Sequence, residues 1–153
     1  MSTLTTLRPL TEREFVDYRR QFIADWAADL ARVDRLTLPA AVALATARTD
    51  ASLPHGLATP GHHLDAVCAG DVQVGVLWFS VESDAAFLDD LTILEPHRRR
   101  GHARRALELF ELAARALGLT RLDLHVFRDN PGAIALYEQL GFATTGLKMR
   151  KFL

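Results

Sequence analysis

Apolar positions along the chain recur at helical spacing in some segments and at strand spacing in others. Spacings of three and four residues follow a capping-box pattern at residues 11–14 and predict a first helix through Val33. Apolar spacing, with proline at a first turn or glycine at an end, predicts three more helices at residues 39–48, 101–117 and 131–141. Runs rich in apolar and β-branched residues predict strands at residues 4–7, 64–69, 72–81, 86–94 and 122–127, then a final hairpin of residues 142–145 and 147–153. Residues 51–63 hold two prolines and two glycines and predict a loop.

The order of these elements predicts one mixed α/β domain spanning residues 1–153, and composition narrows its class. With 49% hydrophobic and 24% charged residues, the chain suits a globular domain with a sizeable core. The net charge of −1 argues against general nucleic-acid binding, and no apolar run reaches the roughly 20 residues that span a membrane. The single cysteine, Cys68, is interpreted as a buried thiol in a strand and cannot form an internal disulfide. We therefore expect a cytoplasmic protein.

Residues 91–103 read as a strand, a basic turn and the start of a helix, and this segment is the most informative one. Gly101 and Ala103 are small residues where a backbone would approach an anion closely, and the first N–H groups of a helix have no partner within it. Five arginines crowd the positive end of the helix dipole, where cations are disfavoured: Arg98, Arg99, Arg100, Arg104 and Arg105. The pattern indicates a phosphate ligand and does not match the glycine spacing of nucleotide-triphosphate or dinucleotide loops. The alternative is a basic turn that caps an ordinary helix.

The spacing Arg98-x-x-Gly101-x-Ala103 resembles the Gln/Arg-x-x-Gly-x-Gly/Ala signature of the acetyl-CoA pyrophosphate loop in GCN5-related N-acetyltransferases, the GNAT family. A second run, from Asn130 to Phe142, resembles the Asn-x-x-Ala-x-x-Leu-Tyr-x-x-x-Gly-Phe element that follows the fifth strand of that family. The resemblance is tight from about Phe87 onward, and residues 53–64 resemble a bacterial subgroup of unknown substrate. It implies a single GNAT domain of the α/β (α+β) class, whose mixed, mostly antiparallel, splayed sheet has helices on both faces.

The resemblance also implies that acetyl-CoA binds at the turn as a co-substrate. Its pyrophosphate would lie on backbone amides, and its pantetheine arm would pair with strand backbone near the end of the preceding strand. The residues expected to contact it are Thr92, Ile93, Arg98, Arg99, Arg100, Gly101, His102, Ala103, Arg104, Asn130, Ala133 and Tyr137. Asn130, which precedes a proline, also fits a plain helix N-cap.

Acyl transfer to an amine needs a proton acceptor for the amine and a proton donor for the leaving thiolate. Tyr137 is the expected donor because it matches the tyrosine of the family motif, although it also fits a helix residue that packs on Phe142. Asp90 is the first candidate for holding or deprotonating the amine, and Asp89 is the second. Adjacent residues of a strand point to opposite faces, so only one of the two is expected to face the substrate. Each also fits an edge carboxylate in an ion pair, and ordered water can replace a dedicated base.

Three histidines, His55, His62 and His63, fall in or beside the predicted loop. With no cysteine or carboxylate pattern nearby, their spacing is weak for zinc, and no metal is expected. Ordering of the loop is the favoured role, and His62 and His63 are the candidates for contact with the acceptor substrate. His97 and His102 flank the basic turn and are expected to help position the cofactor.

The interpretation that joins these features is an acetyl-CoA-dependent N-acetyltransferase in which a primary amine attacks the thioester directly in a ternary complex. The acceptor, a small-molecule or peptide amine, stays open, and a homodimer is expected only from the family resemblance. Two alternatives are a non-catalytic acyl-CoA-binding module on the same fold and a transferase that uses a different acyl-CoA.

Overall fold

The computed structural model describes residues 3–153 and divides into two compact units, Met1–Asp123 and Leu124–Leu153. The strands β1 (Thr5–Pro9), β2 (His62–Ala69), β3 (Val72–Glu82), β4 (Ala85–Ile93) and β5 (Arg121–Leu124) form one sheet in that order. The first three pairings, β1 with β2, β2 with β3 and β3 with β4, are antiparallel. The predicted fold class is confirmed by this sheet and its helices.

Strand β5 starts level with β4 but is shorter. Just before the two strands begin, the backbone N–H of Thr120 donates to the carbonyl of Asp84 at 2.9 Å. Because β5 has four residues and β4 has nine, the later part of β4 extends past the assigned end of β5. The assigned pairing of β5 with β4 therefore ends before the segment of β4 that runs toward Ile93.

Three helices belong to the first unit: α1 (Glu12–Asp34), α2 (Leu38–Ser52) and α3 (His102–Ala116). The predicted capping box at the start of α1 is present, with Thr11 and Glu14 each accepting from the backbone N–H of the other. Arg8 of β1 also holds Glu14 at 2.8 Å, and this bond is the main reason that the pKa of Glu14 falls to about 2. After the C-terminal end of α3, Gly118 is left-handed with φ 76°, as expected for a residue that ends a helix.

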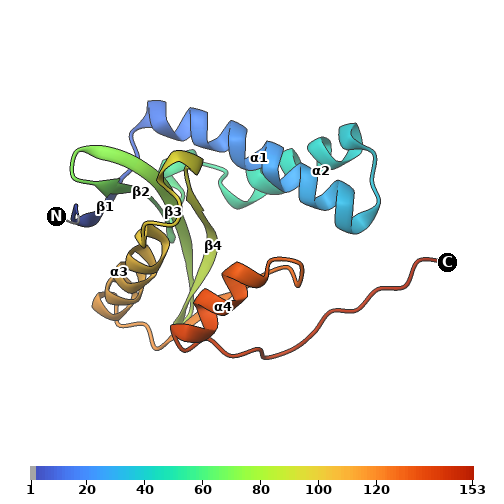
Figure 1. Cartoon of the computed structure of the whole chain (residues 1–153). Coiled ribbons are helices and arrows are strands. Elements are labelled where there is room, and N and C mark those ends of the chain that lie inside the picture. The colour runs from blue at the N-terminus through green and yellow to red at the C-terminus, as the bar shows by residue number, and fades with distance from the viewer. Residues whose placement is uncertain (1–2) are drawn as a thin grey trace. The chain divides into compact units, whose positions relative to one another are not determined.

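The helices cover both faces of the sheet (Figure 1). On one face, Phe15 of α1 packs with Leu64, Cys68 and Trp78, and the half-buried Phe22 joins them. On the other face, Phe79 of β3 lies 5.0 Å from the ring of Phe110 of α3. Alternate residues of β3 thus enter different cores, which is why its apolar run is continuous. The prediction that Cys68 is buried is confirmed.

Residues 51–63 are more ordered than a loop, so this prediction was wrong in part. Helix α2 runs to Ser52, followed by a short 3₁₀ turn at Gly56–Ala58, and β2 begins at His62. Thr49 explains the extension of α2, because its buried hydroxyl donates back to Ala45 and its carbonyl accepts from the N–H of Leu53. The helix thus continues to Ser52 and ends before Pro54, which it cannot include.

The second unit consists of helix α4 (Pro131–Gln139) and the chain on either side of it. The predicted helix is present, but two strand predictions were wrong. Strand β5 stops at Leu124 rather than at residue 127, and residues 142–153, all of which are described, form neither helix nor strand. A strand pattern needs a paired neighbour to become a strand, and residues 147 and 149 are exposed instead. Between residues 3 and 153, no helix is long and apolar enough to cross a membrane.

Candidate functional site

The basic turn between β4 and α3 has a strained backbone. After a short 3₁₀ turn at Glu95–His97, Arg99 adopts a left-handed conformation with φ 62°, and Gly101 does so with φ 84°. Gly101 is the N-cap of α3, and a Cβ built on it would meet no atom within 4 Å, so glycine is required there by conformation and not by space. A left-handed arginine is costly, and such strain is characteristic of functional turns.

The turn places backbone N–H groups at the positive end of α3. The first N–H of the helix to be bonded in it is that of Arg105, which donates to Gly101 at 3.1 Å. The N–H groups of His102 and Ala103 precede it in the first turn and point out of the end of the helix, as in anion sites of this type.

Several side chains of the turn are already occupied. Arg98 donates through Nε to the carbonyl of Ile93 at 2.7 Å, and Arg105 pairs with Glu108 at 3.0 Å. His102 is buried, and its Nδ1 lies 3.0 Å from the hydroxyl of Thr5 in β1, so its ring joins the helix to the sheet. A hollow of 380 Å³ lies beside the turn, lined by Thr3, Leu4, Thr5, Arg100, Gly101, His102 and Arg105. What the turn offers to an anion is its backbone, with the exposed Arg100 at the rim.

Asp89 and Asp90 of β4 lie on the same face of the sheet, so the prediction of opposite faces was wrong. Trp78 of β3 pairs with Asp90, but the next residue, Phe79, pairs with Leu88, which leaves Asp89 as an extra residue in a β-bulge. Ser80 lies two residues after Trp78 and hydrogen-bonds to Asp89. The bulge brings both carboxylates to the α1 side.

Asp90 is held by hydroxyl groups from two elements. Its Oδ2 accepts from Tyr18 of α1 at 2.7 Å and from Thr92 at 3.0 Å. Burial raises the pKa of the Asp90 carboxyl, while these two hydrogen bonds act to lower it. Burial and the charge of Asp90 raise the pKa of Tyr18 well above its usual value, so the phenol stays protonated and donates. The contact connects α1 to β4.

The Asp89 carboxylate has fewer hydrogen-bond partners than that of Asp90. Its Oδ2 is buried and has no hydrogen-bond partner among the described residues. Burial raises the pKa of Asp89 to about 6, the Ser80 hydrogen bond opposes this, and the charges of Glu82 and Asp90 add to it. A carboxyl that titrates near neutral pH and lacks a donor is suited to accept a proton or a cationic group.

The histidines of β2 are divided between the faces. His62 lies opposite Ser80, and its Nδ1 accepts from the indole N–H of Trp78 at 3.0 Å, which leaves the proton of a neutral ring on Nε2. Burial is also the main cause that lowers the pKa of His62. His63 instead stacks on Phe79 at 4.5 Å, on the α3 side. The structure therefore brings His62, but not His63, to the face that holds the acids.

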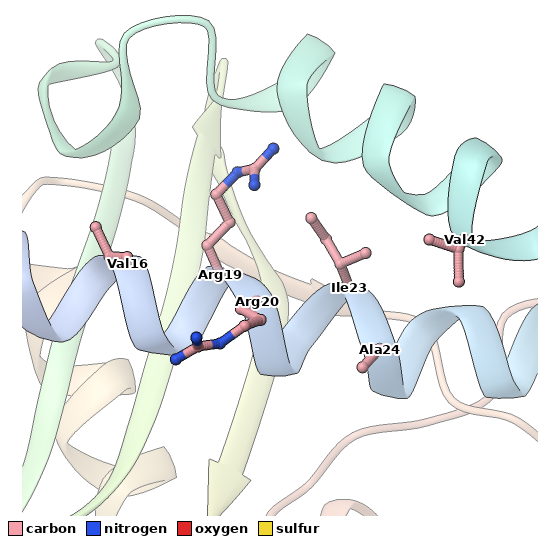
Figure 2. Close-up of a pocket in the computed structure, with 6 residues that line it drawn as sticks. All are labelled: Val16, Arg19, Arg20, Ile23, Ala24 and Val42. Carbon is pink, nitrogen blue, oxygen red and sulfur yellow. The ribbon is translucent and has the colours of Figure 1, made fainter.

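A second hollow, of 470 Å³, lies between α1 and α2 (Figure 2). It is lined by Val16, Arg19, Arg20, Ile23, Ala24 and Val42. Arg19 pairs with Asp50 and Arg20 with Asp17, so its cations are already neutralised. None of the predicted site residues lines this hollow.

The sequence model of the Acetyltransferase (GNAT) family matches residues 20–142. The chain belongs to the GNAT family. Among its curated relatives, the uncharacterized N-acetyltransferase YycN of Bacillus subtilis (strain 168) is 42% identical over 104 residues, which are 65% of this chain and 67% of YycN. The uncharacterized N-acetyltransferase YdgE of the same organism is 29% identical over 95% of this chain and 96% of its own. The protein is thus an acetyltransferase.

Solved structures agree with the GNAT fold. The crystal structure of YycN superimposes with a TM-score of 0.92 at 34% identity and covers 98% of this chain and 99% of its own. The PaiA N-acetyltransferase of Thermoplasma acidophilum, solved in complex with coenzyme A, superimposes with a TM-score of 0.72 at 13% identity, covering 95% of this chain and 93% of its own. At that identity the second likeness supports the fold alone.

The GNAT motif residues of the second unit are placed within that unit. Asn130 caps α4, with its Oδ1 accepting from the N–H of Ala133 at 3.3 Å, so the plain N-cap interpretation holds. The ring of Tyr137 lies 5.8 Å from that of Phe142, edge to face. Their roles toward a cofactor or substrate stay predictions.

Sequence reasoning missed Tyr18, Ser80 and the bulge at Asp89. Tyr18 lies in the apolar stripe of α1, where its ring packs beside Phe22 and where spacing alone predicts a core residue. Its hydroxyl was the available signal, because a buried phenol needs a partner. Among residues 3–153, no cluster of three or more His, Cys, Asp or Glu side chains could hold a metal.

Proposed function

We propose that this GNAT protein transfers the acetyl group of acetyl-CoA to a primary amine by direct attack. One observation carries the proposal: β4 bears the acid pair on one face and leads directly into the anion-binding turn. A substrate that spans both would have a phosphate group at the turn and a reacting group beside the strand. PaiA, which has the same fold, was solved in complex with coenzyme A, and this supports coenzyme A binding by a protein of this fold.

The residues of the turn fit a pyrophosphate. Backbone N–H groups from Arg99 to Arg104 would hold it, because the start of α3 presents N–H groups at the end of the helix where the dipole favours an anion. The exposed guanidinium of Arg100 would add a charge-assisted contact. Toward the thioester end, Thr92 and Ile93 lie where β4 extends past the assigned end of β5, and their backbone would pair with the pantetheine amides.

Asp89 is the better candidate for accepting the proton of the amine. Asp90 was the first choice from the sequence, but its carboxylate is already occupied by Tyr18 and Thr92. Asp89 keeps an unpartnered oxygen and a pKa of about 6, so it is largely ionised at neutral pH and can still take up a proton. In this proposal Asp90 fixes the geometry of the site and adds negative charge that attracts a cationic acceptor, and His62 lines the same face.

Bound acetyl-CoA supplies the activated acetyl group as a thioester. By the family motif, Tyr137 would donate its Oη proton to the sulfur that leaves, and the backbone N–H near Ile93 would stabilise the developing oxyanion. Asn130 and Ala133 would lie along the pantetheine arm, again by the motif. The acceptor is assigned here only as a primary amine.

Calorimetric titration tests the proposal. Acetyl-CoA and free CoA are titrated into the wild-type protein and into a variant that carries Arg100→Glu and Gly101→Asp. These changes place negative charge where the pyrophosphate would lie, so micromolar binding to wild type is expected to be lost in a variant that remains folded by circular dichroism. Failure of the wild type to bind at millimolar ligand would contradict the proposal. If binding is found, an amine library is screened with wild type and with Tyr137→Phe.

A further inference from the structure

Ser80 of β3 and Asp89 of β4 are diagonal neighbours on the α1 side of the sheet. Ser80 pairs with Phe87, and Asp89 comes two residues later in β4. Alternate residues of a strand share a face, so the two side chains project on the same side. Diagonal neighbours in a sheet are close enough for polar side chains to meet. The Ser80 hydroxyl accordingly hydrogen-bonds to the Asp89 carboxyl.

This hydrogen bond distinguishes the two oxygens of Asp89. Oδ2 is buried and has no partner among the described residues, so the bond from Ser80 is to Oδ1. A hydroxyl has one proton to donate, and an ionised carboxylate only accepts. Oδ1 is therefore held by the protein, whereas Oδ2 is left for a ligand that donates a proton or a hydrogen bond.

Ser80 itself is fixed in place by the sheet. It is 6% exposed, and the residues on either side of it pair with Leu88 and Ala86 of β4. A buried hydroxyl needs a partner, because leaving it unbonded costs free energy. Ser80 is therefore a donor in a defined position, and its bond limits the rotation of the Asp89 carboxyl.

The charged groups of β3 and β4 oppose ionisation of Asp89. Burial is the main cause that raises the pKa of Asp89, and the charges of Glu82 on β3 and Asp90 on β4 add to it. The hydrogen bond from Ser80 acts in the other direction, because it stabilises the charged form. Among the described residues, Ser80 is the group that lowers this pKa.

The titratable groups that α1 and β2 bring to this face are neutral or acidic. Tyr18 of α1 is protonated, because burial and the charges of the nearby carboxylates, Asp25 of α1 among them, raise its pKa. His62 of β2 lies opposite Ser80, and burial is the main cause that lowers its pKa and so favours the uncharged ring. Among these groups, the hydroxyl of Ser80 is thus the support that Asp89 has for its charge.

We propose that Ser80 is the positioning residue of acetyl transfer: its hydroxyl holds Oδ1 of Asp89, so that Oδ2 stays directed at the amine and takes up its proton. This inference rests on the proposed function, in which Asp89 accepts that proton. As the bond from nitrogen to the acetyl carbon forms, the carbon–sulfur bond breaks, the sulfur leaves with the electron pair, and the amine proton passes to Oδ2. Ser80 keeps its own proton throughout, so it acts through Asp89 and not on the substrate.

NMR titration of the aspartate side-chain carboxyl carbons tests this contact on the full chain without any substrate. The signal of Asp89 is assigned by its absence in Asp89→Asn. Ser80→Ala removes only the hydroxyl oxygen, so the pKa of Asp89 is expected to rise above the wild-type value of about 6, whereas Ser80→Thr keeps a hydroxyl and should stay near wild type. Thr49→Val is the matched control, because it removes a buried hydroxyl that bonds within α2 and should leave this pKa unchanged. A pKa of Asp89 that does not rise in Ser80→Ala would overturn the proposal.

Steady-state kinetics against pH, with an amine found in the library screen, separate positioning from a merely structural role. A carboxyl with a higher pKa is less ionised at each acidic pH, so the loss of kcat in Ser80→Ala relative to wild type should be largest at the acidic end and shrink as the pH rises. A loss that is the same at every pH would overturn the proposal. Full activity of Asp89→Asn would refute the role of Asp89 on which the inference rests. Because the NMR titration needs no acetyl-CoA, it distinguishes failure of this inference from failure of the proposed function.

Discussion

The basic turn and the acid pair adjoin the same strand but are built in opposite ways. The turn uses consecutive residues, and its chemistry lies in backbone N–H groups at the start of α3. The acid pair uses side chains from α1, β3 and β4, with Tyr18 and Asp90 separated by 72 positions in the sequence. A site whose chemistry lies in backbone groups tolerates side-chain substitutions but depends on the backbone angle φ. A site whose chemistry lies in side chains depends instead on packing between elements far apart in the sequence.

Asp89→Asn is expected to have the largest effect on activity. It keeps the size of the side chain but removes the proton acceptor, so kcat/KM for the amine should fall by about 10²-fold or more. The limb of the pH profile governed by a pKa of about 6 should also disappear. Steady-state kinetics against pH measure both.

Asp90→Asn is the control for that change. Since Asp90 is assigned to positioning, the variant should keep the acidic limb while its rate falls less. If the limb vanishes in Asp90→Asn and survives in Asp89→Asn, the roles of the two acids are reversed.

Tyr18→Phe tests the long-range contact that positions Asp90. The phenol donates to a carboxylate, and loss of such a hydrogen bond costs about 1.5–3 kcal/mol of unfolding free energy. Denaturant unfolding measures this for Tyr18→Phe alone and in an Asp90→Ala background, which has no acceptor for the phenol, so most of the cost should vanish there. Equal losses in both backgrounds would show that the hydroxyl does not act through Asp90.

Gly101→Ala tests the backbone nature of the turn. A side chain at a left-handed position costs roughly 1 kcal/mol, which is about a fivefold change in an equilibrium constant. Gly118→Ala is the matched control, because Gly118 is also left-handed with open space around it but lies at the other end of α3. Both variants should lose similar stability, and only Gly101→Ala should lose affinity for CoA in calorimetry.

The same contrast explains what could be predicted from the sequence. The turn could be predicted from the sequence because its small residues, arginines and helix start are contiguous. The capping box at Thr11 and the burial of Cys68 could be predicted from equally local patterns. That Asp89 and Asp90 lie on the same face of the sheet could not be predicted from the sequence. It depends on one extra residue in β4 relative to β3, and the sequence of one strand alone does not determine its pairing register. The prediction of a final hairpin was wrong for the same reason, since the alternating pattern of a strand does not determine which strand it will pair with.

The last prediction is a pH dependence of stability that belongs to Asp89. Burial, with the charges of Glu82 and Asp90 adding to it, raises the pKa of Asp89 from 3.8 to about 6 in the folded protein, and Ser80 opposes the shift. Between these values the folded state binds more protons than the unfolded state, so this group makes stability fall as pH rises from about 4 to about 6. Above that range the buried charge is a constant penalty. Asp89→Asn removes the penalty, so thermal unfolding should show the variant gaining on wild type as the pH is raised from 4 to 7. A difference between the two melting temperatures that does not change with pH would show that the carboxyl titrates in the folded protein as it does in the unfolded chain.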